Sequence, residues 1–177
     1  MELKGSKTEA NLWAAFAGES QARNKYTYFG SQARKEGYQQ IGDFFDQTAE
    51  NEKEHAKLWF QLLGGIAGTS ENLRHAGLGE KYEWSEMYKE FEEVAKAEGF
   101  DQIARMFHGV AQIEKSHEER FNALRANLEE GKVFRRESSQ TWVCRNCGYL
   151  YTGEAAPNIC PVCSHPQAYF QLKEENY

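Results

Sequence analysis

Apolar side chains recur at helical spacing along most of the chain and predict four long helices. Within residues 101–130, for example, Ile103, Phe107 and Val110 follow one another at intervals of four and three positions. Side chains at these intervals share one face of a helix, which then packs on a core. The predicted helices cover residues 8–36, the stretch between Gly37 and Gly64, residues 80–98 and residues 101–130.

Residues 64–79 interrupt this pattern, because they are rich in glycine and show no strong period. Fully extended, a segment of this length spans roughly 50 Å, whereas a helix of 25 residues is about 38 Å long. The segment is therefore long enough to return along the length of a bundle. It predicts a mainly α-helical, ferritin-like four-helix bundle with a long crossover.

The helical period is lost after Trp142, where aromatic residues surround two pairs of cysteines in short segments typical of β-strands. About 36 residues are too few to bury a sufficient core, so a bound metal ion is expected to stabilise them. Residues 132–141 are charged and contain serine, and we interpret them as a linker. The chain is thus predicted to form a helical domain over residues 1–137 and a small metal-binding domain over residues 138–177.

The first two predicted helices recur in the last two at a constant offset of 62 positions. The motif Glu52-x-x-His55 corresponds in this way to Glu114-x-x-His117. An internal repeat of this length predicts a bundle made of two similar helix pairs. Further identical pairs at the same offset are Glu36 and Glu98, Gly37 and Gly99, Ile41 and Ile103, Phe45 and Phe107, and Ala49 and Ala111.

Each Glu-x-x-His motif places a carboxylate and an imidazole on the same helix face, because residues three apart on a helix are neighbours. Two such motifs, with carboxylates from the other two helices, form the ligand set of a di-metal site. A single Glu or His is usually solvated or structural, but here the motif occupies core positions in both halves of the repeat. Buried carboxylates need cations, and mixed carboxylate and imidazole ligands suit non-haem iron or manganese. The candidate ligands are Glu19, Glu52, His55, Glu80, Glu83, Glu114 and His117.

The repeat loses its symmetry at one carboxylate. The offset maps Glu19 onto Lys81, whereas the third predicted helix offers Glu80 and Glu83 instead. One half thus supplies one further carboxylate and the other half supplies two. Either one member of the pair faces solvent, or it is an additional ligand that attaches and detaches as the metal changes its oxidation state.

The four cysteines form two Cys-x-x-Cys pairs, Cys144 with Cys147 and Cys160 with Cys163, separated by 12 residues. In a chain that stays in a reducing compartment, this spacing predicts a tetrahedral metal site with four thiolate ligands, and not disulfide bonds. The spacing alone does not decide between zinc and iron.

Composition and charge narrow the classes of partner. The net charge is −6, and Arg145 and Lys173 are the only Arg or Lys residues after position 140, so neither nucleic acid nor an anionic membrane is an expected partner. No apolar run approaches the roughly 20 residues that cross a bilayer. The first residues lack the apolar core of a signal peptide. We therefore expect a cytoplasmic protein.

Taken together, the motifs resemble those of the rubrerythrin family, over almost the whole chain and in the family's domain order. The motifs that carry the resemblance are Phe-Ala-Gly-Glu-Ser-Gln-Ala-Arg at 16–23, Glu52-x-x-His55, Glu80-x-x-Glu83, Glu114-x-x-His117, Cys-Arg-Asn-Cys-Gly-Tyr at 144–149 and Cys-Pro-Val-Cys at 160–163. The resemblance implies a ferritin-like di-iron domain joined to a rubredoxin-like domain. Ser164-His165 departs from the Gly that usually follows the second cysteine pair in rubredoxins, which can shift the local backbone but not the number of ligands.

The resemblance also implies a role for individual residues. Glu52 and Glu114 would bridge the two ions, and Glu83 would exchange with His55 at one iron upon redox change, so these four residues are the expected catalytic ones. Three iron ions are implied per chain, with no haem and no flavin. The implied ligands are Glu19, Glu52, His55, Glu80, Glu83, Glu114 and His117 for the di-iron site, and Cys144, Cys147, Cys160 and Cys163 for the third iron.

The activity implied is a peroxidase that reduces hydrogen peroxide to water as a defence against oxidative stress. Electrons would pass from an NAD(P)H-dependent reductase or a rubredoxin to the thiolate-bound iron, and from there to the di-iron site. The family is typically a homodimer or a larger homo-oligomer. Tyr26 and Tyr88 would either hydrogen-bond a ligand carboxylate or pack in the core.

Three other functions remain as alternatives. A ferroxidase that handles or stores iron is the main one, but the four-cysteine module has no purpose in it. A non-enzymatic helical bundle with a structural zinc ribbon would leave the repeated Glu and His positions unexplained. An oxygen-activating hydroxylase would need a pocket for an organic substrate, and the sequence does not indicate one.

Overall fold

The computed structural model describes residues 2–174. The chain divides between Ala67 and Gly68 into two compact units. No helix in the described part of the chain combines the length and the apolar character needed to span a membrane. The mainly α-helical class with a small antiparallel sheet, predicted from the sequence, is confirmed.

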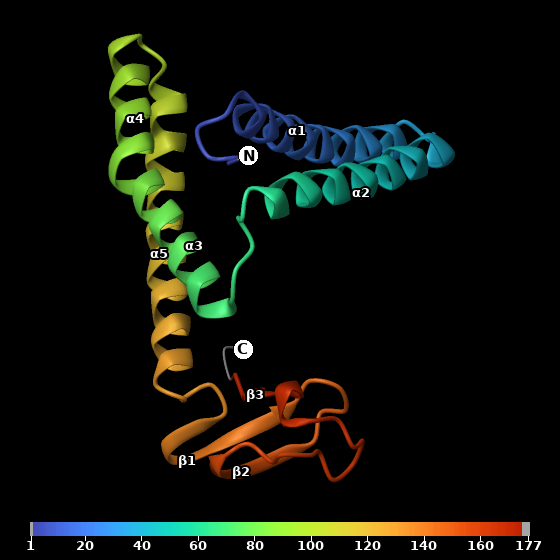
Figure 1. The fold of residues 1–177 in the computed structure, drawn as a ribbon, viewed down its shortest axis with the longest axis vertical. Coiled ribbons are helices and arrows are strands. Elements are labelled where there is room, and N and C mark those ends of the chain that lie inside the picture. The colour runs from blue at the N-terminus through green and yellow to red at the C-terminus, as the bar shows by residue number, and fades with distance from the viewer. Residues whose placement is uncertain (1, 175–177) are drawn as a thin grey trace. The chain divides into compact units, whose positions relative to one another are not determined.

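The first unit is an antiparallel pair of helices, α1 (Lys7–Lys35) and α2 (Gln39–Leu62), which lie side by side (Figure 1). The hydroxyl of Ser6 accepts a hydrogen bond from the backbone N–H of Glu9 at 3.1 Å, which satisfies a free donor at the start of α1. Gly37 follows the end of α1 with a φ of 93°, a left-handed conformation that favours glycine and lets the chain reverse into α2.

The second unit begins with another antiparallel helix pair. One arm is continuous and consists of α3 (Thr69–Tyr82), a π-helical turn (Glu83–Met87) and α4 (Tyr88–Ala97). The other arm is α5 (Asp101–Glu129), which packs along the whole of the first arm (Figure 1). Gly99, with a φ of 84°, reverses the chain between them as Gly37 does in the first unit.

Both helix pairs contain the same small aromatic cluster. In the first unit Tyr26, Phe29 and Phe45 pack with ring centroids 5.7 to 6.4 Å apart. Their counterparts 62 positions later pack with centroids 5.6 to 6.2 Å apart, and these are Tyr88, Phe91 and Phe107. Tyr26 and Tyr88 therefore both pack against aromatic side chains, whereas the described part of the chain contains no hydrogen bond from either phenol to a ligand carboxylate.

The crossover predicted for residues 64–79 is wrong over most of its length. Helix α3 begins at Thr69, so the connection between α2 and α3 is limited to residues 63–68. The glycines suggested an irregular segment, but Gly77 is buried inside α3, where a Cβ atom would lie 3.0 Å from Oδ1 of Asn122 in α5. Glycine at this position permits close helix packing and does not end the helix.

The C-terminal part of the second unit is a small antiparallel sheet in the order β2-β1-β3. Its strands are β1 (Arg135–Cys144), β2 (Leu150–Ala155) and β3 (Phe170–Leu172). Trp142 is fully buried near the end of β1, and its indole N–H donates to the carbonyl of Gly153 at 2.9 Å. The core around it consists of Cys144, Ala156, Cys160 and Phe170.

The linker predicted for residues 132–141 is wrong from Arg135 onward, because β1 begins there and Arg135 pairs with Ala155. The pairing register shifts between Arg135 and Gln140, and most side chains in this part of the strand are exposed. A solvated, irregular strand carries the same charged and polar residues as a linker. The boundary between residues 137 and 138 stays a prediction.

Helices α1 and α2 approach each other closely at Gly30 and Gly42, which are both buried. A Cβ atom at Gly30 would lie 2.8 Å from Oδ1 of Asp46 and 3.1 Å from the carbonyl oxygen of Gly42. We expect Gly30→Ala to lower the free energy of unfolding of the metal-free protein by about 1–2 kcal/mol, because backbone has to move. Urea denaturation followed by circular dichroism measures this change.

The control for Gly30→Ala is Gly109→Ala in α5, where a Cβ atom would meet nothing within 4 Å. This variant is expected to gain about 0.5–1 kcal/mol, because alanine has the higher helix propensity. A gain in both variants would contradict the close approach of α1 and α2.

Candidate metal centres

The first unit brings together one carboxylate of α1 and the Glu-x-x-His motif of α2. Nδ1 of His55 lies 2.9 Å from a carboxylate oxygen of Glu52 and 3.9 Å from one of Glu19. One ligand atom from each of these side chains lies within 4.8 Å of the other two. These separations suit three ligands of a single ion.

The second unit repeats this arrangement with residues of α3 and α5. Nδ1 of His117 lies 2.6 Å from a carboxylate oxygen of Glu114 and 3.8 Å from one of Glu80. The three ligand atoms again lie within 4.8 Å of one another. Six of the seven predicted ligands therefore occur in two equivalent Glu–Glu–His triads, one in each unit.

The electrostatics of the second triad favour a bound cation. Burial raises the pKa of Glu80 above its ordinary value, and the neighbouring charge of Glu114 raises it further. His117 opposes these effects only in part. A divalent ion would relieve the repulsion between these carboxylates that raises the pKa of Glu80, so this donor set fits a metal that prefers oxygen and imidazole ligands.

Glu83, the seventh predicted ligand, is outside both triads. It is the first residue of the π-helical turn, and its carbonyl accepts the backbone N–H of Tyr88, which is the hydrogen-bond spacing of a π-helix. Burial raises the pKa of Tyr88, and the charge of Glu83 raises it further. The carboxylate of Glu83 also raises the pKa of Glu80, so it lies near the second triad without joining it.

A shift in the repeat, which a single constant offset conceals, explains the π-helical turn. Before the turn the two helix pairs match at an offset of 61, and from Tyr88 onward they match at 62. The second helix pair therefore has one extra residue between Glu80 and Tyr88, and the π-helical turn accommodates it. The identical pairs at the offset of 61 are Thr8 and Thr69, Asn11 and Asn72, Leu12 and Leu73, Ala15 and Ala76, Gly18 and Gly79, and Glu19 and Glu80. Aligning each half with this gap would have paired Glu19 with Glu80 from the sequence alone.

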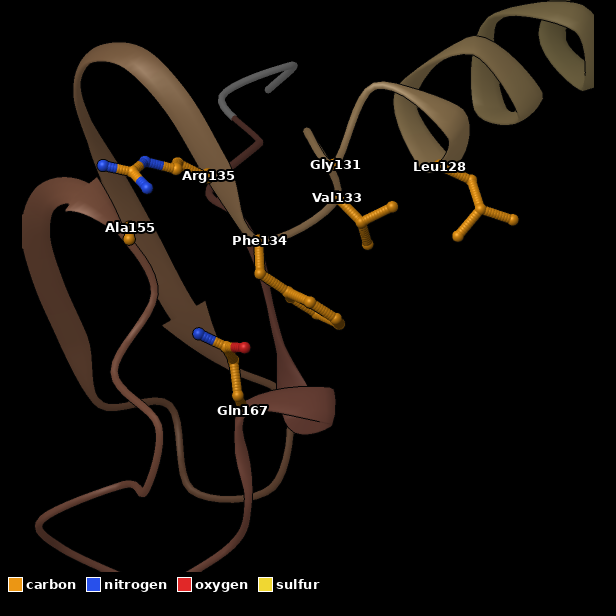
Figure 2. Close-up of a pocket in the computed structure, with 7 residues that line it drawn as sticks. All are labelled: Leu128, Gly131, Val133, Phe134, Arg135, Ala155 and Gln167. Carbon is orange, nitrogen blue, oxygen red and sulfur yellow. The ribbon is translucent and has the colours of Figure 1, made fainter.

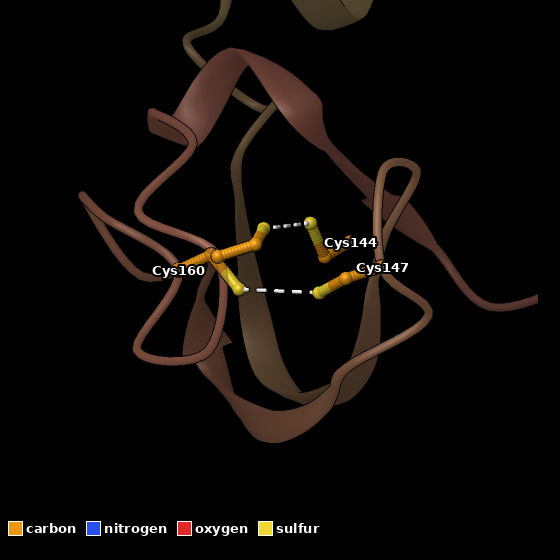
Figure 3. A group of neighbouring side chains, drawn as sticks. Cys144, Cys147 and Cys160 are labelled. Carbon is orange, nitrogen blue, oxygen red and sulfur yellow. Dashed lines mark hydrogen bonds between the residues drawn. The ribbon is translucent and has the colours of Figure 1, made fainter.

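The four thiols of the second unit already have the spacing of a tetrahedral site. Sγ of Cys144 lies 3.7 Å from Sγ of Cys163, and Sγ of Cys147 lies 3.6 Å from Sγ of Cys160 (Figure 3). A tetrahedron with metal–sulfur bonds of about 2.3 Å has sulfur atoms about 3.8 Å apart. The thiols are free, and all four sulfur atoms lie within 4.8 Å of one another, so they suit one tetrahedral ion.

The two cysteine loops have the same backbone geometry although their sequences differ. Gly148, with a φ of 77°, donates its N–H to the carbonyl of Cys144 at 2.8 Å. Ser164, with a φ of 59°, donates in the same way to Cys160 at 2.9 Å. The replacement of glycine by serine thus leaves the loop in place, at a cost of about 1–2 kcal/mol for the left-handed conformation.

The next residue, His165, affects the thiol beside it. Its backbone N–H is the largest of the interactions that lower the pKa of Cys163 to about 6, and neighbouring thiols lower it further against the effect of burial. The thiolate that a metal requires therefore forms readily at this position.

A separate pocket of about 410 Å³ lies where α5 meets the sheet within the second unit (Figure 2). Its walls are mainly the side chains of Leu128, Val133 and Phe134, with Arg135 and Gln167 at the sheet. None of the predicted metal ligands lines it. The pocket therefore gives no support to a hydroxylase that would hold an organic substrate beside the metal.

A repeated helix pair with Glu–Glu–His triads, followed by a four-thiolate β-domain, defines a ferritin-like metal protein with a rubredoxin-like domain. Comparison with known families agrees. The rubrerythrin family model matches residues 10–125, and the model of the rubrerythrin rubredoxin-like domain matches residues 142–171. The chain belongs to the rubrerythrin family.

Similar proteins share nearly the whole length of the chain. Rubrerythrin of Porphyromonas gingivalis is 50% identical over 99% of this chain and 94% of its own length. Rubrerythrin of Nitratidesulfovibrio vulgaris is 48% identical over 99% of this chain and 98% of its own length. Rubrerythrin-1 of Clostridium acetobutylicum is 46% identical over the same shares.

Family membership settles which metal the donors serve. The chain has the ligands for three iron ions, two at the carboxylates and imidazoles and one at the four thiolates. The zinc alternative that the cysteine spacing left open is thus not favoured.

The raised pKa of Glu80 predicts a pH-dependent effect of Glu80→Gln on the metal-free protein. Because the folded state holds the proton more tightly than the unfolded state, the stability of the native protein falls as pH rises above the ordinary pKa of 4.5. The variant should therefore be more stable than the native protein at neutral pH. This gain should vanish below about pH 4, where the carboxyl is protonated in both states. Thermal unfolding of both proteins across this range measures the difference, and a loss of stability at neutral pH would contradict the assigned direction.

Proposed function

We propose that this chain is a peroxidase that reduces hydrogen peroxide to water at a di-iron site. The observation that carries the proposal is the pair of equivalent Glu–Glu–His triads, in a chain of the rubrerythrin family. The proposed ligands are Glu19, Glu52, His55, Glu80, Glu83, Glu114 and His117.

The chemistry needs two electrons and two protons for each peroxide. When bound, two ferrous ions supply the electrons, and the O–O bond of hydrogen peroxide breaks to give two molecules of water. Glu52 and Glu114 would be ligands shared by the two ions, and Glu83 and His55 would serve as alternative ligands of one of them. Burial and the nearby carboxylates raise the pKa of Tyr88 above its ordinary value, and its phenol O–H would donate a hydrogen bond at this site.

Electrons would reach the di-iron site through the iron held by the four thiolates. Cys144 and Cys160 are buried, whereas Cys147 is exposed, so a donor would approach from the side of Cys147. We propose that the donor is an NAD(P)H-dependent reductase or a rubredoxin. The free thiols fit a reducing compartment, the cytoplasm, and we propose that the protein acts there as a homodimer or a larger homo-oligomer in defence against oxidative stress.

Rapid mixing of the fully reduced, iron-loaded protein with peroxide and with dioxygen tests the proposal. A peroxidase is oxidised much faster by peroxide and turns over when a reductase supplies electrons. Faster oxidation by dioxygen, with release or mineralisation of ferric iron, would instead show a ferroxidase.

Cys160→Ser should stop peroxide turnover that is driven by a reductase, because it removes a ligand of the electron-relaying iron. The reduced di-iron site should still react once with peroxide. Comparing steady-state turnover with a single oxidation in a stopped-flow spectrometer measures both. If the single oxidation is lost as well, the two centres do not act separately.

Glu83→Ala should slow peroxide turnover by about 10- to 100-fold while the iron content stays the same, because it removes only the ligand that exchanges. The matched control is Glu86→Ala, which changes an exposed carboxylate in the same π-helical turn. Iron analysis and turnover are measured on the same samples. Unchanged turnover in Glu83→Ala would remove the case for an exchanging ligand.

A further inference from the structure

The π-helical turn is linked to α5 by a hydrogen bond between half-buried side chains. The indole N–H of Trp84, the second residue of the turn, donates to Oε2 of Glu118 at 2.6 Å. The other carboxylate oxygen of Glu118 accepts from the amide of Asn122 at 3.4 Å. The ammonium of Lys115 lies 5.6 Å from the centre of the indole ring. Two side chains of α5, Glu118 and Lys115, thus contact Trp84 in the turn, and Asn122 supports Glu118.

The first helix pair lacks this link. The position of Glu118 is occupied there by Ala56, and residues 20–25, which correspond to residues 81–87, include no aromatic side chain. In that pair α1 is a regular helix without an extra residue. The hydrogen-bonded pair therefore occurs in the half of the repeat that contains the π-helical turn, and it is missing from the half that does not.

A π-helical turn needs something to fix its position. The single extra residue could be accommodated at several places between Glu80 and Tyr88, because each place gives one irregular turn in an otherwise regular helix. If the irregular turn moves along the helix past a given residue, the side chain of that residue rotates about the helix axis by about 100°, since a helix has about 3.6 residues per turn. A shift past Glu83 would therefore turn its carboxylate away from the second triad.

We propose that the hydrogen bond from Trp84 to Glu118 fixes the position of the π-helical turn and thereby directs the carboxylate of Glu83 toward the metal site. Trp84 and Glu118 are positioning residues, which contact neither the peroxide nor the iron. The effect on catalysis rests on the proposed function, in which Glu83 is a ligand. The effect on the π-helical turn does not depend on the proposed function, because it is measured on the protein without metal.

The first experiment measures amide hydrogen exchange in the metal-free protein, in peptides that cover residues 81–90. Trp84→Phe removes the N–H donor but keeps an aromatic ring, and Glu118→Ala removes the acceptor. Both should speed exchange of the Tyr88 amide by about tenfold, because this amide forms the hydrogen bond of the turn to Glu83. Glu118→Gln keeps an acceptor oxygen and should exchange nearly as the native protein does. The control is Glu119→Ala, which removes an exposed carboxylate next to Glu118.

The double variant of Trp84→Phe and Glu118→Ala provides a stricter test. Its exchange should match that of the single variants, because both substitutions remove the same hydrogen bond. Additive effects, or native exchange rates in all variants, would overturn the proposal.

The second experiment measures peroxide turnover of the iron-loaded protein. Trp84→Phe and Glu118→Ala should lower turnover severalfold at unchanged iron content, and Glu118→Gln should restore it. In a Glu83→Ala background, Trp84→Phe should have no further effect, because the side chain that it positions is absent. Faster exchange with native turnover would overturn the positioning role and leave the peroxidase assignment intact. Absence of turnover in the native protein would overturn the peroxidase assignment, while the exchange measurements would still decide whether the pair holds the turn.

Discussion

The structure depends on one electrostatic constraint, which is the placement of two carboxylates beside one imidazole within each helix pair. Such a group is unfavourable when desolvated, as the raised pKa of Glu80 shows, and a cation removes the penalty. The remaining features of each pair serve to hold the three side chains together. The close approach of the helices at Gly30 and the aromatic cluster around Tyr26 in one unit fix the distance and rotation of the helices that carry them.

The thiolate centre also holds its ligands close together, but through different interactions. Its four sulfur atoms are held within 4.8 Å of one another by backbone hydrogen bonds in two short loops and by a core centred on Trp142. A centre that changes little in geometry suits the transfer of single electrons, because reorganisation is small. The carboxylate ligands are carried by long helices and flexible side chains, which suits the ligand exchange that we propose for Glu83.

Much of this could be predicted from the sequence, since the two Glu-x-x-His motifs and the carboxylates at core positions of the other two predicted helices identify six residues that the structure places in two triads. Long amphipathic helices and a cysteine pattern have strong periodic signals. The beginning of α3 was missed because glycine at position 77 reflects helix packing, and the start of β1 was missed because an exposed, irregular strand resembles a linker. The π-helical turn was missed because a constant offset of 62 hides a gap of one residue.

The extra residue between Glu80 and Tyr88 makes the surroundings of the two metal ions differ, although the two helix pairs are otherwise repeats of each other. Two copies of one helical hairpin would give two ions identical surroundings, and therefore no preference for which ion rearranges during turnover. Lengthening one copy by a single position breaks this degeneracy without changing any of the residues that the copies share. The number of residues between two ligands can thus differentiate the ions of a pair as effectively as the choice of the ligands themselves.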